Sequence, residues 1–253
     1  MSMEKWVAVW CLLLPLLGTS LGAAAVFCLP GGLRPGLRQL LLGMAAGVMT
    51  AASVWSLLLP ALELAGPRLT WLQPSAGLLS GIGFLLLLDR LALRLRRKTA
   101  DPEPGSMLLL AVTLHNVPEG MAVGVAAAGA LAGLPGLTAQ AALLALGIAV
   151  QNVPEGAIIS MPMAGRGTPR GRAFLWGFLS GAVEPAAAAL TLLVTALVSR
   201  ALPVVLSFAA GAMLYVVMVE LVPEAQPEPE SRWGVVGAAL GFVLMMLLDV
   251  CFG

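Results

Sequence analysis

The chain has 253 residues, of which 59% are hydrophobic and only 11% are charged, and its mean hydropathy is +0.96. This composition excludes a soluble globular domain and is typical of a polytopic membrane protein. A net charge of +1 gives no indication of nucleic acid binding. We therefore expect an all-α polytopic membrane protein whose residues 1–253 form a single transmembrane domain.

Eight apolar segments are long enough to cross a bilayer, which requires about 20 apolar residues each. Clusters of Pro and Gly between them mark the approximate limits. The predicted spans are residues 6–28, 38–62, 71–92, 107–130, 137–163, 172–199, 202–222 and 233–252. The first segment also has features of a secretory signal, because Lys5 precedes an apolar run and small residues at 23–25. Its apolar run continues to full spanning length, which favours a span.

Basic residues are distributed unevenly over the predicted loops. With eight spans and both termini on the extracytoplasmic side, 11 of the 14 Lys and Arg residues fall on the inner side. Cytoplasmic loops of membrane proteins carry such an excess. The charge pattern therefore predicts this orientation, and we expect the plasma (inner) membrane as the location.

Glycines recur at helical spacing within the predicted spans. Residues this small, four positions apart, allow the backbones of two membrane helices to approach closely. The pattern predicts a tightly packed bundle, and its members are Gly18/Gly22, Gly43/Gly47, Gly77/Gly81, Gly120/Gly124, Gly177/Gly181 and Gly237/Gly241.

One six-residue phrase occurs twice within the apolar spans, as His-Asn-Val-Pro-Glu-Gly at 115–120 and as Gln-Asn-Val-Pro-Glu-Gly at 151–156. Polar groups at this depth in a membrane are costly and usually functional. Residues at i, i+3 and i+4 share one face of a helix. Each copy therefore presents its polar side chains together: His115, Asn116 and Glu119 in the first copy, and Gln151, Asn152 and Glu155 in the second.

The prolines of the two copies add a backbone effect. Neither Pro118 nor Pro154 has the N–H that would bond to the carbonyl four residues earlier, so each copy frees one carbonyl. Consecutive spans run antiparallel, and this allows the two polar faces to meet near the middle of the membrane. A third carboxylate, Glu184, lies in the middle of the sixth predicted span.

The three buried carboxylates require a positive charge. No Lys or Arg lies at matching depth in any predicted span, and an uncompensated buried carboxylate is strongly penalised. The compensating charge must therefore be a divalent cation or protons. Imidazole, carboxylate and amide groups together suit Zn²⁺ and other first-row divalent metals. We expect protons to occupy the empty site and metal binding to release them.

The doubled phrase on consecutive spans of such a chain resembles the ZIP (Zrt/Irt-like) divalent metal transporters, and their GufA-type branch most closely. The resemblance implies a binuclear centre in spans four to six. One metal would be held by His115, Glu119, Gln151 and Glu155, and the second by Asn116, Asn152 and Glu184, with Glu119 and Glu155 bridging. It also implies a homodimer, and alternating access in which a bundle containing these spans moves against a scaffold and carries metal toward the cytoplasm.

Two features depart from the family pattern. Many members carry His-Glu where this chain has Gln151-Asn152, and the neutral amides reduce the anionic ligand strength of the site. The loop after the third span is often long and histidine-rich in the family, but here it is short and lacks histidine.

Two other functions use the same residues. An intramembrane metal-dependent enzyme would need a pattern such as His-Glu-x-x-His, which a chain with one histidine cannot supply. A proton or cation carrier would need only the carboxylates. We expect a transporter rather than an enzyme, with no prosthetic cofactor and with Zn²⁺ or another divalent metal as the bound substrate.

Other acidic residues are weaker candidates. Glu220 and Glu224 would lie near the inner end of the seventh span, where they either receive metal or are ordinary boundary charges. Glu63, Asp89 and Asp249 lie near span ends, and we expect them to reach the lipid headgroups.

Overall fold

The structure is a computed structural model that describes residues 3–28, 33–65, 71–96, 104–133, 136–197, 202–227 and 230–252. Every regular element in these ranges is helical, which confirms the predicted all-α class. The elements are α1 (Met3–Ala23), α2 (Ala25–Cys28), α3 (Pro35–Ala52), η1 (Ser53–Leu58), α4 (Leu59–Leu64), α5 (Leu72–Arg96), α6 (Pro104–Leu131), α7 (Leu137–Gly165), α8 (Arg170–Gly181), α9 (Val183–Leu197), α10 (Leu202–Val216), η3 (Val217–Leu221), α11 (Val222–Ala225) and α12 (Trp233–Phe252).

Seven stretches of the described residues are long and apolar enough to cross a membrane. These seven stretches correspond to all of the predicted spans except the fourth. The bounds of α12 coincide with those of the last predicted span, 233–252. The fourth prediction falls on α6, a continuous helix of 28 residues that is not among the seven. The side chains of residues 104–115 in α6 lie outside the described part of the structure.

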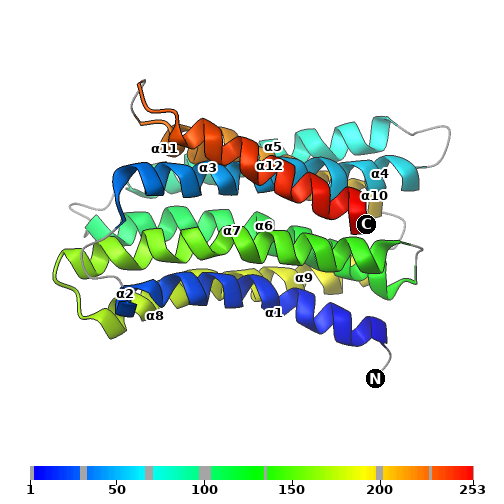
Figure 1. Cartoon of the computed structure of the whole chain (residues 1–253). Helices are drawn as coiled ribbons and strands as arrows, with labels where there is room; N and C mark the ends of the chain where they lie inside the picture. The colour runs from blue at the N-terminus through cyan, green and yellow to red at the C-terminus, as the bar shows by residue number, and fades with distance from the viewer. Residues whose placement is uncertain are drawn as a thin grey trace.

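The helices form two packed groups. In the first group α1 lies along α7, and α6 lies along α9; in the second, α3 lies along α12, and α5 lies along α10. Figure 1 shows α1, α8 and α9 on one side, α3, α5 and α12 on the other, and α6 and α7 between them. The groups meet mainly where α7 contacts α3 and where α6 contacts α10.

The predicted glycine pairs are the points of closest helix contact. In all six pairs, an added Cβ atom would overlap atoms of a neighbouring helix. The α3–α12 contact is reciprocal, because Gly43 and Gly47 face the α12 backbone while Gly237 and Gly241 face the α3 backbone. Small residues allow this approach where lipid and side chain are equally apolar and burial gives little driving force.

The sixth predicted span is not one continuous helix. It consists of α8 and α9, which are separated at Ala182. Pro185 explains the break, because it cannot donate to the Gly181 carbonyl and its ring would clash with that group. The interruption places Glu184 in the first turn of α9, where the N-terminal helix dipole favours a carboxylate.

Two predicted spans contain a π-helical segment. In the second span η1 is followed by Pro60, and in the seventh span η3 is followed by Pro223. Each proline removes the bond to the carbonyl four residues earlier, which lies within the π segment, so the wider turn accommodates the loss.

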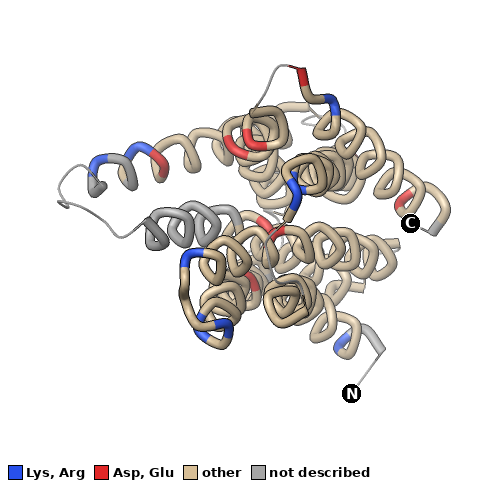
Figure 2. The backbone as a smooth tube through the Cα atoms, turned by 60° about the vertical axis from the view of Figure 1, so that its left-hand side comes forward, with Lys and Arg blue, Asp and Glu red and all other residues tan. Residues whose placement is uncertain are grey.

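Large apolar residues cover the outside of the bundle, while a few carboxylates are buried in its interior. Leu79 is 66% exposed and Leu190 is 64% exposed, whereas Glu119 and Glu184 are each only 1% exposed. Figure 2 shows Lys and Arg toward the ends of the described helices, while some acidic residues lie inside the bundle. The chain is therefore an integral membrane protein with buried carboxylates in an otherwise apolar core.

Replacing Gly47 tests the α3–α12 contact. A Gly47→Ala substitution places its Cβ against the α12 backbone and should cost about 1–3 kcal/mol of stability. Gly83→Ala is the matched control, because an added Cβ at Gly83 on α5 meets nothing. Thermal unfolding in detergent should show a melting temperature several degrees lower for Gly47→Ala alone. Equal melting temperatures would contradict the close packing.

Candidate metal centre

Three helices of the first group bring the predicted ligands together. Asn116 and Glu119 are on α6, Gln151, Asn152 and Glu155 are on α7, and Glu184 is on α9. All are at most 1% exposed except Glu155, which is partly exposed. The helical position of His115 lies in α6, but its side chain is outside the described residues.

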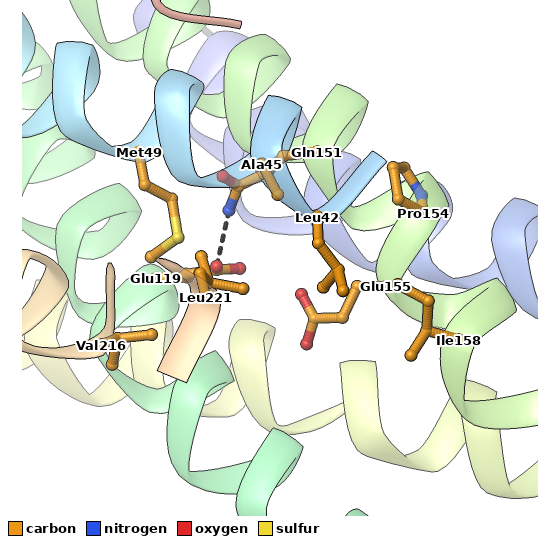
Figure 3. A pocket seen from close by; sticks show the side chains of 10 residues that line it. All are labelled: Leu42, Ala45, Met49, Glu119, Gln151, Pro154, Glu155, Ile158, Val216 and Leu221. Atoms are coloured by element: carbon orange, nitrogen blue, oxygen red, sulfur yellow. Dashed lines mark hydrogen bonds between the residues drawn. The ribbon is translucent and has the colours of Figure 1, made fainter. Parts of the chain in front are cut away.

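Glu119 and Gln151 form the contact between the two copies of the phrase. The Gln151 side-chain amide donates from Nε2 to Glu119 Oε1 over 2.6 Å (Figure 3). The glycine that follows Glu119 supports this geometry, because Gly120 lies against the Glu184 carbonyl of α9. The first copy is thus held against both α7 and α9.

Glu184 accepts one hydrogen bond on each carboxylate oxygen. Asn152 donates from Nδ2 to Glu184 Oε2 over 2.8 Å, and Thr19 of α1 donates to Glu184 Oε1 over 3.1 Å. Asn152 Nδ2 also lies 3.3 Å from the Pro15 carbonyl oxygen of α1. These contacts join α1, α7 and α9 around one carboxylate.

Asn116 stabilises the break between α8 and α9. Its Nδ2 donates to the Ser180 carbonyl over 2.8 Å. Ser180 is in the last turn of α8, where carbonyls lack partners within the helix. The amide therefore supplies a hydrogen bond that the interrupted helix cannot make.

The amide nitrogens are used in these contacts, but the acceptor oxygens are not. Several buried side-chain oxygens in the described residues have no hydrogen-bond donor, and those at the centre include Asn116 Oδ1, Glu119 Oε2, Gln151 Oε1 and Asn152 Oδ1. Buried polar atoms normally have partners, and an exception requires an explanation. Several unsatisfied acceptors on neighbouring side chains are what a bound cation would use.

The electrostatics of the centre favour the same kind of ligand. Glu119, Glu155 and Glu184 lie close enough for their charges to interact. Among the described residues, no Lys or Arg forms an ion pair with Glu119 or Glu184. A cation in the centre would relieve the repulsion between the carboxylates.

A pocket opens on one side of the centre. Glu119, Gln151 and Glu155 line it from the first helix group, and apolar residues of α3, α10 and η3 line it from the second (Figure 3). Glu155, the most exposed of the predicted ligands whose side chains the structure describes, points into this space. The pocket therefore lies at the boundary between the two groups.

Carboxylates alone do not complete a metal site. Within the described residues, no group of three or more His, Cys, Asp and Glu side chains is arranged to hold one ion. The His115 side chain lies outside the described residues, and the acceptor oxygens of Asn116, Gln151 and Asn152 have no donor within them.

The weaker acidic candidates have other partners. Glu224 forms an exposed ion pair of 3.2 Å with Arg38. Asp89 and Asp249, which we expect to reach the headgroups, are partly buried and bonded within the protein. Asp89 accepts from Tyr215, and Asp249 accepts from Ser56 in η1.

Sequence reasoning missed the contribution of α1. Thr19 is fully buried against Glu184, yet its helix carries none of the predicted ligands. A proline four residues before a threonine, within a span that also carries Gly18/Gly22, was the available signal. It could not be interpreted without knowing which helix α1 contacts.

The fold and the site together define a class, namely a polytopic helical membrane protein with a buried acceptor-rich centre for a cation. Comparisons with known proteins identify the family within this class. The family model described as ZIP zinc transporter matches residues 95–249. The chain is 36% identical to Zinc transporter ZIP11 of Homo sapiens, an alignment that covers 93% of this chain and 94% of the relative.

Two bacterial relatives have a similar sequence identity to the chain. The chain is 38% identical to Zinc transporter GufA of Myxococcus xanthus, over 83% of this chain and 85% of the relative. It is also 38% identical to Zinc transporter ZIPB of Bordetella bronchiseptica, over 84% of this chain and 71% of the relative. The chain therefore belongs to the ZIP zinc transporter family. It is a membrane transporter for divalent metal rather than an enzyme, as predicted.

Removing the Asn116 side chain tests whether its hydrogen bond to the Ser180 carbonyl stabilises the break between α8 and α9. Asn116→Ala leaves the buried Ser180 carbonyl without its donor and should destabilise the protein by about 1–3 kcal/mol, even in a metal chelator. Ser160→Ala is the control, since the buried Ser160 hydroxyl bonds only to the Gly156 carbonyl of its own helix. Chemical or thermal unfolding in chelator measures the difference. Equal stability of the two variants would show that the amide does not support the α8–α9 break.

Proposed function

We propose that the chain moves Zn²⁺ or a related divalent first-row metal ion toward the cytoplasm through a binuclear site inside the first helix group. The observation that carries this proposal is the set of unsatisfied buried acceptors beside Glu119 and Glu184. A proton carrier is less well supported, because uncharged amide oxygens do not take up protons near neutral pH, whereas they coordinate metals.

The proposed ligands divide into two sets, one for each metal ion, and two carboxylates bridge the ions. The first set consists of Glu119, Gln151 and Glu155, which line the pocket, together with His115. The second set is Asn116, Asn152 and Glu184, which lie deeper among α1, α8 and α9. Glu119 and Glu155 are proposed as the bridging ligands, as the resemblance to the ZIP family implies.

The membrane arrangement is proposed as one domain of eight spans across residues 1–253. At about 1.5 Å per residue, the 28 residues of α6 extend roughly 42 Å, which is sufficient for the eighth span. The N-terminal end of α1 and the C-terminal end of α12 lie at the same end of the bundle (Figure 1), which supports an even number of spans. Both termini are assigned to the extracytoplasmic side by the excess of basic residues in the opposite loops, and the plasma (inner) membrane is the proposed location.

Alternating access is proposed as movement of the first helix group against the second. All seven ligands belong to α6, α7 and α9, while the opposite wall of the pocket belongs to α3, α10 and η3. The ions can therefore travel with their ligands while the other wall stays in place. The second group, held by the reciprocal glycine contacts of α3 and α12, is the proposed scaffold and the proposed surface for a homodimer.

Uptake of metal into proteoliposomes tests the site. Glu119→Gln and Glu155→Gln remove two charges without changing shape, and each should reduce Zn²⁺ uptake by about a hundredfold or more, since even indirect partners of a metal ligand are worth about 10–100-fold. Glu63→Gln is the control, because Glu63 is an exposed carboxylate in α4. A panel of divalent ions in the same vesicles measures selectivity. Undiminished uptake by both variants would remove the proposed site from the mechanism.

Cross-linking tests the movement. Leu42 of α3 and Ile158 of α7 belong to one buried cluster but to different helix groups. In a background without Cys11, Cys28 and Cys251, joining cysteines at 42 and 158 with a short thiol linker should stop transport reversibly. The control joins cysteines at 27 and 174, where Phe27 and Phe174 pack within the first group at 5.6 Å between ring centroids. Full transport with the first pair cross-linked would contradict relative movement of the groups.

A further inference from the structure

We propose that Thr19 of α1 is a positioning residue of the metal centre, whose hydroxyl holds the Glu184 carboxylate in the orientation that binds metal. The inference rests on the function proposed above and extends it to a helix that carries none of the predicted ligands. It assigns α1 a part in metal binding beyond packing.

The hydroxyl of Thr19 has one hydrogen and two acceptors within reach. Glu184 Oε1 lies at 3.1 Å, and the Pro15 carbonyl of the same helix lies at 3.3 Å. Glu184 Oε1 is the nearer of the two. When metal is bound, Glu184 is a carboxylate, and a hydrogen bond to a charged acceptor is about twice as strong as one to a neutral acceptor, which favours donation to Glu184 over donation to Pro15.

Comparison with other hydroxyls in the bundle supports this direction. A serine or threonine in a helix commonly bonds to the carbonyl four residues earlier. Thr50 makes this bond at 2.7 Å and Ser20 makes it at 2.6 Å. The corresponding distance for Thr19 is 3.3 Å, so its hydroxyl has given up a good local bond and lies toward the carboxylate.

Two glycines fix the position of Thr19. An added Cβ at Gly156 of α7 would overlap the Thr19 carbonyl, and one at Gly181 of α8 would crowd the Thr19 side chain. Thr19 is consequently enclosed by the helix that carries Asn152 and by the helix that precedes Glu184. This packing holds Thr19 beside Glu184.

The contact orients a second ligand as well. With Thr19 on Oε1, Glu184 offers Oε2 to the amide of Asn152, whose Nδ2 also faces the Pro15 carbonyl. Both contacts take the nitrogen, so Asn152 Oδ1, which has no donor, is the atom left to face a metal. Hydrogen-bonded partners of ligating carboxylates generally act in this way.

Zinc titration of the purified full-length protein by calorimetry tests the proposal. Thr19→Val keeps the shape of the side chain and removes the hydroxyl, and it should weaken binding of the ion at Glu184 by about 10–100-fold. Thr19→Ser restores the hydroxyl and should restore most of the affinity. Thr50→Val makes the identical chemical change at a residue that bonds only to the Ala46 carbonyl of its own helix, and it should bind as the unmodified protein does.

A double-mutant cycle separates positioning from folding. If Thr19 acts through Glu184, adding Thr19→Val to Glu184→Gln should produce no further loss of zinc affinity, whereas independent effects would add. Wild-type affinity for Thr19→Val, failure of Thr19→Ser to recover binding, or full additivity in the cycle would each overturn the proposal. Should Thr19→Val not fold, Thr19→Ala, which also lacks the hydroxyl, takes its place in the titration and in the cycle.

The same titration distinguishes this inference from the function on which it rests. Loss of zinc binding in Glu119→Gln together with normal binding in Thr19→Val would overturn only the role of Thr19. Normal binding in Glu119→Gln and Glu155→Gln would overturn the proposed centre itself.

Discussion

Within the described residues, no cationic side chain bonds to the buried carboxylates of Glu119 and Glu184, and this is the constraint on which the rest of the structure depends. Each ionised group placed in an apolar bundle loses hydration, and its neighbours add repulsion. The protein offsets part of this with neutral donors, namely Gln151 toward Glu119 and Thr19 and Asn152 toward Glu184. Neutral donors cannot cancel the charge, however, and the amide oxygens beside the carboxylates have no donor among the described residues.

Helix packing makes this arrangement possible. Donors and carboxylates on four different helices meet only because the backbones approach closely, and the glycines at 120, 156 and 181 provide that approach beside the centre. The second helix group uses the same device between α3 and α12. In the proposed alternating access, the first group carries the ligands and the second group is the support against which it moves.

Much of the fold could be predicted from the sequence, because span length and glycine spacing are local properties. The limits of α12, the glycine contacts and the grouping of Glu119, Gln151 and Glu155 are examples. The break at Ala182 and the π segments were not predicted, since Pro185, Pro60 and Pro223 reveal that a bond is lost but not how the chain adapts. Thr19 was missed for a different reason, because its role depends on which helices enclose α1.

The central claim is that a divalent metal is held by the acceptors that the protein leaves unsatisfied. Anomalous X-ray diffraction at the zinc absorption edge, from crystals of the full chain grown with Zn²⁺, tests this most directly. The account predicts anomalous density among α6, α7 and α9, within coordination distance of Glu119 Oε2 and of at least one of the oxygens Gln151 Oε1 and Asn152 Oδ1. Stoichiometrically bound zinc located elsewhere, with Glu119, Gln151 and Asn152 in their present contacts, would contradict it.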